Sequence, residues 1–190
     1  MKELEERILK DGELVSDDIL KVGSFYNQQI DSVLIHKMAV EWKKLFEGTR
    51  VDKILTIEAS GIAMAIMLAY EFGVPLVFAK KKKTSNINSE VYTTQVTSFT
   101  HGRVYDILVD RKYLNAGENI LITDDFLATG AALIGLKELC DQAGANVVGC
   151  CIGIEKAFQG GGDAIRKQGI RVESLARIKS MDMAKGIEFC

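Results

Sequence analysis

The sequence predicts an α/β fold in which helices flank a mostly parallel sheet. Three observations support this prediction. From residue 51 onward, short apolar stretches typical of buried strands alternate with stretches of helical spacing. Glycines follow two of the predicted helices, at Gly73 and Gly144. Hydrophobic residues make up 47% of the 190-residue chain, which is enough for a sizeable core. The chain has no internal repeat and no linker-like segment, so residues 1–190 are predicted to form a single domain.

The first 46 residues are predicted to be helical and to contain no strand. Residues 1–10 carry apolar side chains at helical spacing, and Gly12 is suited to end this helix. Asp31 is suited to cap a second helix that continues through Phe46.

The remainder of the chain supplies the predicted sheet and its flanking helices. The predicted helices are 61–72 and 129–143. The predicted strands are 53–57, 74–79, 104–109, 120–123, 146–154 and 170–176. Residues 91–99 alternate between apolar and polar, which is compatible with a two-stranded flap. Because ligands of such sheets bind beyond the carboxyl ends of the strands, the loops that follow the strands are predicted to form the binding site.

Composition and charge exclude several classes of function. The chain has 24 Lys and Arg against 26 Asp and Glu, a net charge of −2, which argues against a general nucleic-acid binder. No apolar run approaches the roughly 20 residues of a membrane helix, and the charged N-terminus lacks a signal-peptide apolar region. The four cysteines form no CxxC pair, so neither a zinc site nor a disulfide framework is predicted. We expect a cytoplasmic protein that contacts neither nucleic acid nor membrane.

The strongest local signal follows the predicted strand 120–123. Two carboxylates, Asp124 and Asp125, come first, and carboxylates accept hydrogen bonds from sugar hydroxyls. The small residues 128–132 come next and open a helix, so their backbone N–H groups are suited to wrap a phosphate. A helix capped by acidic residues accounts for this segment less well, because capping needs one Asp and leaves the small-residue run unexplained. The segment is not a Walker loop, since no Lys-Ser/Thr pair follows.

Three other loops carry weaker signals. The loop 58–61 is small enough to let the backbone approach an anion, although an ordinary strand-to-helix turn accounts for it as well. Lys156 is placed to donate to a carbonyl oxygen and Phe158 to stack on a planar ring, although a surface Lys and a core Phe are commoner. The basic run 80–83 opens a long segment to residue 103, which is typical of a lid, whereas most charge runs are solvated turns. Taken together, the loops predict a nucleotide-like ligand. No GxGxxG motif follows a predicted strand, so a dinucleotide cofactor is not predicted.

The segment ILITDDFLATGAA, residues 120–132, resembles the phosphoribosyl-pyrophosphate (PRPP) motif of the type I phosphoribosyltransferases. It departs from the usual pattern at Thr123, Phe126 and Ala132, the last of which loses a side-chain donor. Further segments resemble the xanthine-specific bacterial members of that family. They are KVGSFYNQQID (21–31), TIEASGIA (56–63) and GIEKAF (153–158).

The resemblance implies a role for each loop. The acidic pair Asp124 and Asp125 would hold the ribose hydroxyls. The 5′-phosphate would bind Ala128, Thr129, Gly130, Ala131 and Ala132. The pyrophosphate would bind Glu58, Ala59, Ser60, Gly61 and Lys81. The xanthine would contact Leu20, Asn27, Lys156 and Phe158. The resemblance also implies Mg²⁺ carried with PRPP rather than held directly by the protein, a hood formed by residues 1–46, a mobile lid at 80–103 and a homodimer.

The implied reaction joins xanthine to PRPP and yields xanthosine 5′-monophosphate and pyrophosphate. Three alternatives remain open at this point. A guanine or hypoxanthine enzyme would share every phosphate residue. A non-catalytic regulator that senses PRPP would need a DNA-binding element, and residues 1–46 contain no basic recognition helix. A structural protein would leave the acidic pair unused.

The sequence identifies no firm catalytic residue. The hypoxanthine-guanine enzymes carry an Asp at the position of Ala128, and an alanine cannot transfer a proton. Glu90, in the predicted lid, is the remaining candidate, although a solvated loop Glu is the commoner situation.

Overall fold

The structure, a computed structural model, describes residues 1–81, 90–97 and 104–190. Its α-helices are α1 (Lys2–Asp11), α2 (Ser32–Leu45), α3 (Ile62–Phe72), α4 (Ala131–Ala143) and α5 (Gly161–Arg166). Its strands are β1 (Glu13–Ser16), β2 (Ile19–Lys21), β3 (Lys53–Ile57), β4 (Leu76–Lys81), β5 (Val91–Thr97), β6 (Val104–Asp110), β7 (Asn119–Leu127), β8 (Asn146–Lys156), β9 (Val172–Asp182) and β10 (Gly186–Phe189). Short irregular helical turns follow β2, β6 and β8. They are η1 (Gly23–Asn27), η2 (Arg111–Tyr113) and η3 (Ala157–Gln159).

Eight strands form one sheet in the order β10-β9-β8-β7-β3-β4-β6-β5. Its five central strands, from β9 to β4, pair in parallel, and antiparallel pairs extend it at both edges. The predicted fold class, a mostly parallel sheet flanked by helices, is therefore confirmed. The strand predicted at 104–109 is antiparallel to its neighbours, and residues 91–97 are its edge partner.

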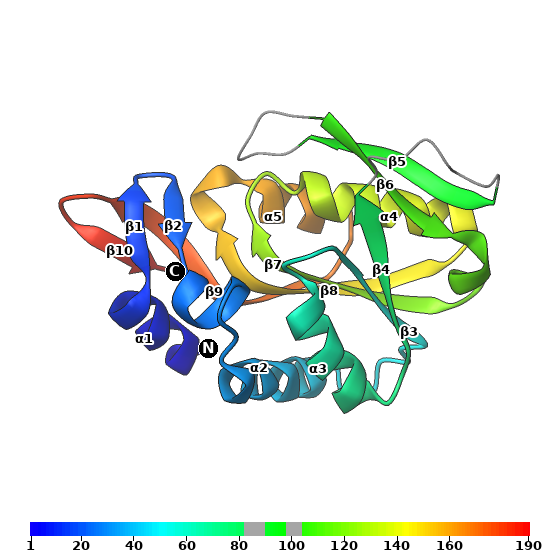
Figure 1. The fold of residues 1–190 in the computed structure, drawn as a ribbon, viewed down its shortest axis with the longest axis horizontal. Helices are drawn as coiled ribbons and strands as arrows, with labels where there is room; N and C mark the ends of the chain where they lie inside the picture. Colours follow the sequence, from blue (N-terminus) through cyan, green and yellow to red (C-terminus); the bar gives the residue numbers. More distant parts are fainter. Residues whose placement is uncertain (82–89, 98–103) are drawn as a thin grey trace.

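Two hydrophobic cores lie on opposite faces of the sheet. Helices α2 and α3 cover one face, and α4 and α5 cover the other (Figure 1). In the first core, Trp42 of α2 is fully buried, and its indole nitrogen donates to the backbone oxygen of Glu173 on β9 at 3.1 Å. The α4 side is filled by aliphatic residues such as Leu133, Leu136 and Leu139. Both faces are sealed, so strands β3 and β7 are apolar over most of their length.

The N-terminal segment is only partly helical, and the prediction that it contains no strand was wrong. Besides α1 and α2 it holds the β1-β2 hairpin, which forms a separate two-stranded sheet. The strands are four and three residues long, too short for periodicity to reveal them. Figure 1 shows this hairpin beside β10 at one end of the molecule.

Several strands are longer than predicted, and this changes where the polar residues lie. Strand β7 continues to Leu127, because Phe126 and Leu127 still pair with β8. The acidic pair therefore lies inside the strand rather than in the loop after it. Strand β8 likewise continues to Lys156. Four neighbouring parallel strands, β8, β7, β3 and β4, consequently end at the same edge of the sheet.

The predicted lid lies partly outside the described residues, at 82–89 and 98–103. Of its described parts, residues 80 and 81 end β4 and residues 91–97 form β5. Within the described part of the chain, no helix is long and apolar enough to cross a membrane.

Candidate active site

A cleft of about 560 Å³ opens at the carboxyl edge of the four parallel strands. It is walled by the ends of β3, β4 and β7, by the loop into α4, by β5 and β6, and by the hood. The following residues line it: Ser16, Asp18, Ile19, Leu20, Asn27, Ile57, Ser60, Lys81, Val96, Thr97, Tyr105, Asp124, Asp125, Phe126, Leu127, Ala128, Thr129, Gly130, Ala131, Ala132, Leu133 and Lys156.

The floor of the cleft is a loop of small residues that turns directly into α4. Gly130 adopts the left-handed conformation, with φ of +88°, which an L side chain rarely tolerates. Among the residues that the structure describes, no side chain caps the N-terminus of α4, so none of them competes for the first N–H groups of the helix. Residues 128–132 all line the cleft. This arrangement of small residues and a helix N-terminus is suited to bind a phosphate.

Two buried carboxylates stand beside this loop. Asp124 is 4% exposed and Asp125 is 9% exposed, and the backbone N–H of Asp125 donates to Oδ1 of Asp124 at 3.0 Å. Burial and the neighbouring charge of Asp125 raise the pKa of Asp124 well above its usual value. A ligand that offers hydroxyl donors or positive charge would relieve this cost.

The hood reaches the acidic pair through η1. The amide Nδ2 of Asn27 donates to Oδ2 of Asp125 at 3.4 Å. The buried hydroxyl of Tyr26 donates to the backbone oxygen of Asp125, also at 3.4 Å. These contacts join the N-terminal segment to the end of β7, so the hood forms one wall of the same cleft.

On the opposite side, β4 brings a lysine toward the carboxylates. The ammonium of Lys81 lies 5.1 Å from the centre of the Tyr105 ring, and its charge opposes the rise in the pKa of Asp124. The backbone N–H of Lys81 donates to the Glu58 carboxylate at 2.7 Å. Glu58 therefore fixes the end of β4 beside the loop after β3.

Lys156 occupies the hood side of the cleft. It is 9% exposed, and its ammonium donates to the backbone oxygen of Asp18 in the hood hairpin at 2.5 Å. It also lies 5.7 Å from the centre of the Phe126 ring. Burial lowers the pKa of Lys156, and the charge of Asp18 opposes that shift. A donor-only group and an aromatic ring thus share this end of the cleft.

A family model for the phosphoribosyl transferase domain matches residues 26–175, well over half of the chain. This chain belongs to the phosphoribosyltransferase family.

Proteins called xanthine phosphoribosyltransferase are among its relatives. One from Bifidobacterium adolescentis is 51% identical, covering 100% of this chain and 99% of the relative. Another from Clostridioides difficile is also 51% identical and covers 96% of both chains. The resemblance seen in the sequence is therefore confirmed.

Solved structures of adenine phosphoribosyltransferases share the fold of this phosphoribosyltransferase. The enzyme from Thermoanaerobacter pseudethanolicus superimposes with a TM-score of 0.73 at 23% identity, covering 92% of this chain and 99% of that one. At this identity the likeness shows the fold alone, which is the type I phosphoribosyltransferase fold predicted from the sequence.

The phosphoribosyltransferase cleft gathers most, but not all, of the residues singled out in the sequence. Leu20, Asn27, Lys156, Ser60, Lys81, the acidic pair and residues 128–132 line it. Phe158, 40% exposed in η3, does not line the cleft. Glu58, Ala59 and Gly61 belong to the loop after β3 but are not lining residues. Glu90 has an exposed side chain and stands at the opposite end of β5 from the cleft-lining Val96 and Thr97.

Sequence reasoning missed the aromatic residues of the phosphoribosyltransferase cleft. Phe126 and Tyr105 both line it, and Phe126 packs edge-on against Tyr26 with the ring centres 6.4 Å apart. Phe126 directly follows the acidic pair, but in the sequence it stands out only as a departure from the motif. Tyr105 lies on an antiparallel strand whose partners were not predicted, so no local signal pointed to it.

Gly61 shows how tightly the loop after β3 approaches the acidic pair. A Cβ at this position would overlap Oγ1 of Thr56, which is fully buried, and would come within 3.4 Å of Oδ1 of Asp124. We expect Gly61→Ala to destabilise the fold by about 1–3 kcal/mol, because overpacking displaces its neighbours. Removing the obstructing hydroxyl with Thr56→Ala should recover part of this loss in the double variant. Urea unfolding of the four proteins measures the coupling, and strictly additive losses would contradict the proposed clash.

Proposed function

We propose that this chain is a xanthine phosphoribosyltransferase, which converts xanthine and PRPP to xanthosine 5′-monophosphate and pyrophosphate. One observation carries the proposal: the carboxylate pair and phosphate loop at the end of β7 share a single cleft with the donor-only ammonium of Lys156. The names of relatives about half identical over their whole length agree with it.

The ribose phosphate part of PRPP would lie along the end of β7. The backbone N–H groups of residues 128–132 and the Thr129 hydroxyl would bind the 5′-phosphate. Asp124 and Asp125 would accept hydrogen bonds from the ribose hydroxyls, which offsets the cost of burying two neighbouring carboxylates. The pyrophosphate would lie toward the loop 58–61 and Lys81.

The residues present fit a Mg²⁺ ion that arrives with PRPP rather than one held by the protein. Among the described residues, no group of three or more His, Cys, Asp or Glu side chains is placed to hold a metal. Mg²⁺ commonly binds through substrate phosphates and one or two carboxylates, and Asp124 and Asp125 are the carboxylates of this cleft that stand beside residues 128–132. Such an ion would supply charge neutralisation on the pyrophosphate.

Lys156 is the residue that we propose to select the base. Its ammonium has three donors and no acceptor, so it suits the 6-oxo group of xanthine. The 6-amino group of adenine would instead place its own N–H donor against the ammonium of Lys156, at a cost of about 1–3 kcal/mol for an unpaired buried group. Phe126, below the ammonium, offers a ring on which the purine can stack. Leu20 and Asn27 of the hood would contact the rest of the base, as the resemblance implies, with Phe158 a further candidate from the sequence.

The reaction forms a bond between a purine nitrogen and C1 of the ribose and breaks the bond from C1 to the pyrophosphate oxygen. Positive charge develops on the ribose as the leaving group departs, as in glycoside chemistry. The buried carboxylates Asp124 and Asp125 lie where they would hold the ribose and stabilise its positive charge. No proton acceptor for the base is assigned, and Glu90 remains a candidate only if the lid brings it to the cleft.

The proposal also includes a lid over residues 80–103, a homodimer and a cytoplasmic location. A lid would exclude water from the positively charged ribose, which is short-lived in water.

Tyr70 and Ile66 on α3 are 78% and 52% exposed and lie one helical turn apart, which offers an apolar face to a second copy in the proposed homodimer. The buried free thiols Cys140, Cys150 and Cys151 suit a reducing compartment.

The proposed function is tested by incubating the protein with PRPP, Mg²⁺ and xanthine and following nucleotide formation by chromatography. We expect xanthosine 5′-monophosphate and pyrophosphate in equal amounts. Binding of PRPP in titration calorimetry without any product would instead support the PRPP-sensing regulator.

A further inference from the structure

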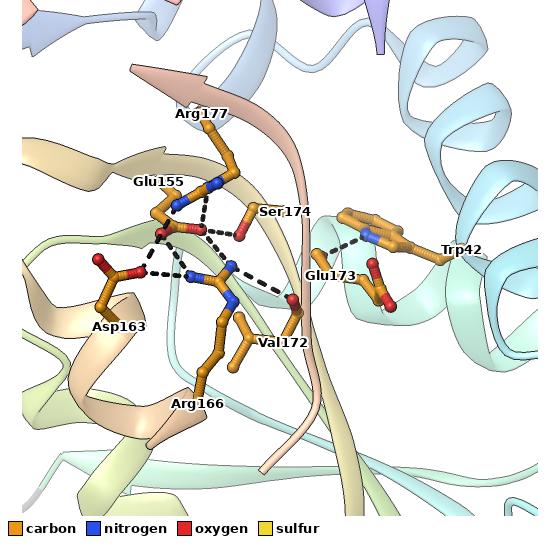
Figure 2. Close-up of polar contacts among 8 residues, drawn as sticks. All are labelled: Trp42, Glu155, Asp163, Arg166, Val172, Glu173, Ser174 and Arg177. Atoms are coloured by element: carbon orange, nitrogen blue, oxygen red, sulfur yellow. Dashed lines mark hydrogen bonds and ion pairs between the residues drawn. The ribbon is translucent and has the colours of Figure 1, made fainter. Parts of the chain in front are cut away.

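Glu155 and Lys156 are consecutive residues at the end of β8, and only Lys156 lines the cleft. The Glu155 side chain reaches toward α5 and β9 instead (Figure 2). Glu155 is 1% exposed, and none of the roles described above uses it. A buried carboxylate is expensive unless it is paired and hydrogen-bonded, so its partners indicate what it does.

The partners of Glu155 come from α5 and β9. Arg166 of α5 donates to both carboxylate oxygens, at 2.8 and 2.7 Å, in the fork-like geometry of a strong pair. From β9, the Ser174 hydroxyl donates at 2.5 Å and the Arg177 guanidinium lies at 3.3 Å. Figure 2 shows the two guanidinium groups converging on this carboxylate. The cluster therefore ties α5 to two strands of the sheet.

The same short helix presses against the phosphate loop on its other side. Gly161 lies so close to the loop that a Cβ there would overlap the backbone of Ala128 and Thr129 and come within 2.7 Å of the Gly130 nitrogen. Ile165 of α5, 2% exposed, packs against Gly130: a Cβ added to Gly130 would come within 2.9 Å of Cδ1 of Ile165. Helix α5 therefore supports the loop.

Gly162 completes the connection between the two contacts. A Cβ at Gly162 would overlap the Glu155 carboxylate itself. Helix α5 is therefore enclosed between the Glu155 carboxylate and the loop at residues 128–130. Any shift of α5 away from Glu155 also moves it relative to the loop, because Gly161 and Gly162 bring the backbone of α5 against both.

We propose that Glu155 is a positioning residue for the phosphate loop, acting through Arg166 and α5. The inference rests on the proposed function, in which residues 128–132 bind the 5′-phosphate of PRPP. It adds a second role to the end of β8, where Lys156 serves the base and Glu155 serves the phosphate. Glu155 does not line the cleft, and its partners lie on α5 and β9. Its loss should therefore weaken PRPP binding and leave xanthine binding unchanged.

Steady-state kinetics of Glu155→Gln test this inference. The variant keeps the size of the side chain but removes the charge that pairs with Arg166. We expect KM for PRPP to rise about tenfold while KM for xanthine and kcat stay within about twofold, because the 5′-phosphate is bound in ground state and transition state alike. Glu173→Gln is the matched control, since Glu173 lies on β9 and pairs with Arg171 at 2.7 Å, away from α5. It should leave both KM values unchanged.

Gly161→Ala tests the same connection without touching the ion pair. The added methyl group must change the position of the loop relative to α5, so KM for PRPP should again rise while KM for xanthine holds. This variant decides the question if Glu155→Gln does not fold. Unchanged KM for PRPP in folded Glu155→Gln or Gly161→Ala, or equal rises in both KM values, would overturn the inference. A wild-type protein that forms no nucleotide would overturn the proposed function instead.

Discussion

Asp124→Asn is expected to lower kcat/KM for PRPP by about 100-fold or more, the scale on which a preorganised electrostatic contact to a transition state acts. The same substitution is expected to raise the melting temperature at neutral pH. Asp124 is buried against Asp125, so its charge opposes folding until a ligand compensates for it. An Asn keeps the acceptor for the Asp125 N–H and removes the charge. Activity and stability should therefore change in opposite directions, as is common at binding sites.

The stability gain of Asp124→Asn should depend on pH. The pKa of Asp124 in the folded protein lies above its usual value of 3.8. Folding consequently takes up a proton in the window above that value, and stability falls as the pH rises through it. The difference in melting temperature between Asp124→Asn and wild type should thus be positive at pH 7 and shrink as the pH approaches 4, roughly the unfolded pKa of Asp. Each kcal/mol is worth about 2–4 °C in a chain of this length.

Asp52→Asn provides the matched control at the other end of the sheet. Asp52 accepts from the backbone N–H and the side-chain amide of Asn119, both at 2.9 Å, and these bonds, together with the contact to Arg50, lower its pKa. Its stability contribution is present at neutral pH and lost as the pH falls. The control should lower the melting temperature and leave kcat/KM unchanged. A stability loss in Asp124→Asn, or no loss of activity, would contradict the role proposed for the acidic pair.

The second large effect is expected for Lys156→Ala, on turnover of the base. We expect kcat/KM for xanthine to fall about 100-fold, because a hydrogen bond from a charged donor contributes about 1.5–3 kcal/mol in a buried site. Binding of PRPP, measured by titration calorimetry without base, should hold within about threefold, since Lys156 lies on the hood side of the cleft. The bond to the Asp18 backbone is lost as well, so the hood hairpin should exchange its amide protons faster.

Lys179→Ala is a suitable comparison for Lys156→Ala. Lys179 is an exposed lysine on β9 whose partner is Glu188, and its removal should change neither xanthine turnover nor PRPP binding. Equal losses of base activity and PRPP binding in Lys156→Ala would remove the basis for assigning Lys156 to the base.

Much of the fold could be predicted because its signals are local. The apolar strand 53–57 and the helix that ends before Gly73 are both present where periodicity and a terminal glycine placed them. The loop 128–132 was equally visible, because a run of small residues between a strand and a helix is typical of a backbone that approaches an anion. The β1-β2 hairpin was missed because three- and four-residue strands carry no readable period.

The parts that could not be predicted depend on contacts between distant segments. Asp124 and Asp125 are expected after the strand, since charged residues normally end a buried run. Pairing of Leu127 with Glu155 instead continues the ladder past them. The bond from Lys156 to Asp18 joins residues 138 positions apart, and no local pattern encodes it. The Glu155 cluster likewise joins β8, α5 and β9 through side chains that look like ordinary surface charges in the sequence.

A single competition reaction tests whether this protein prefers xanthine over the other purine bases. Equimolar xanthine, guanine, hypoxanthine and adenine are incubated with PRPP, Mg²⁺ and the protein, and the nucleotides are separated at low conversion, so that product ratios report ratios of kcat/KM. We expect xanthosine 5′-monophosphate to dominate and adenosine 5′-monophosphate to be the least abundant product. Dominant guanosine or inosine monophosphate would preserve the phosphate site and contradict the assignment of the base. Dominant adenosine 5′-monophosphate would contradict the role of Lys156, and the absence of all four products would contradict the enzyme itself.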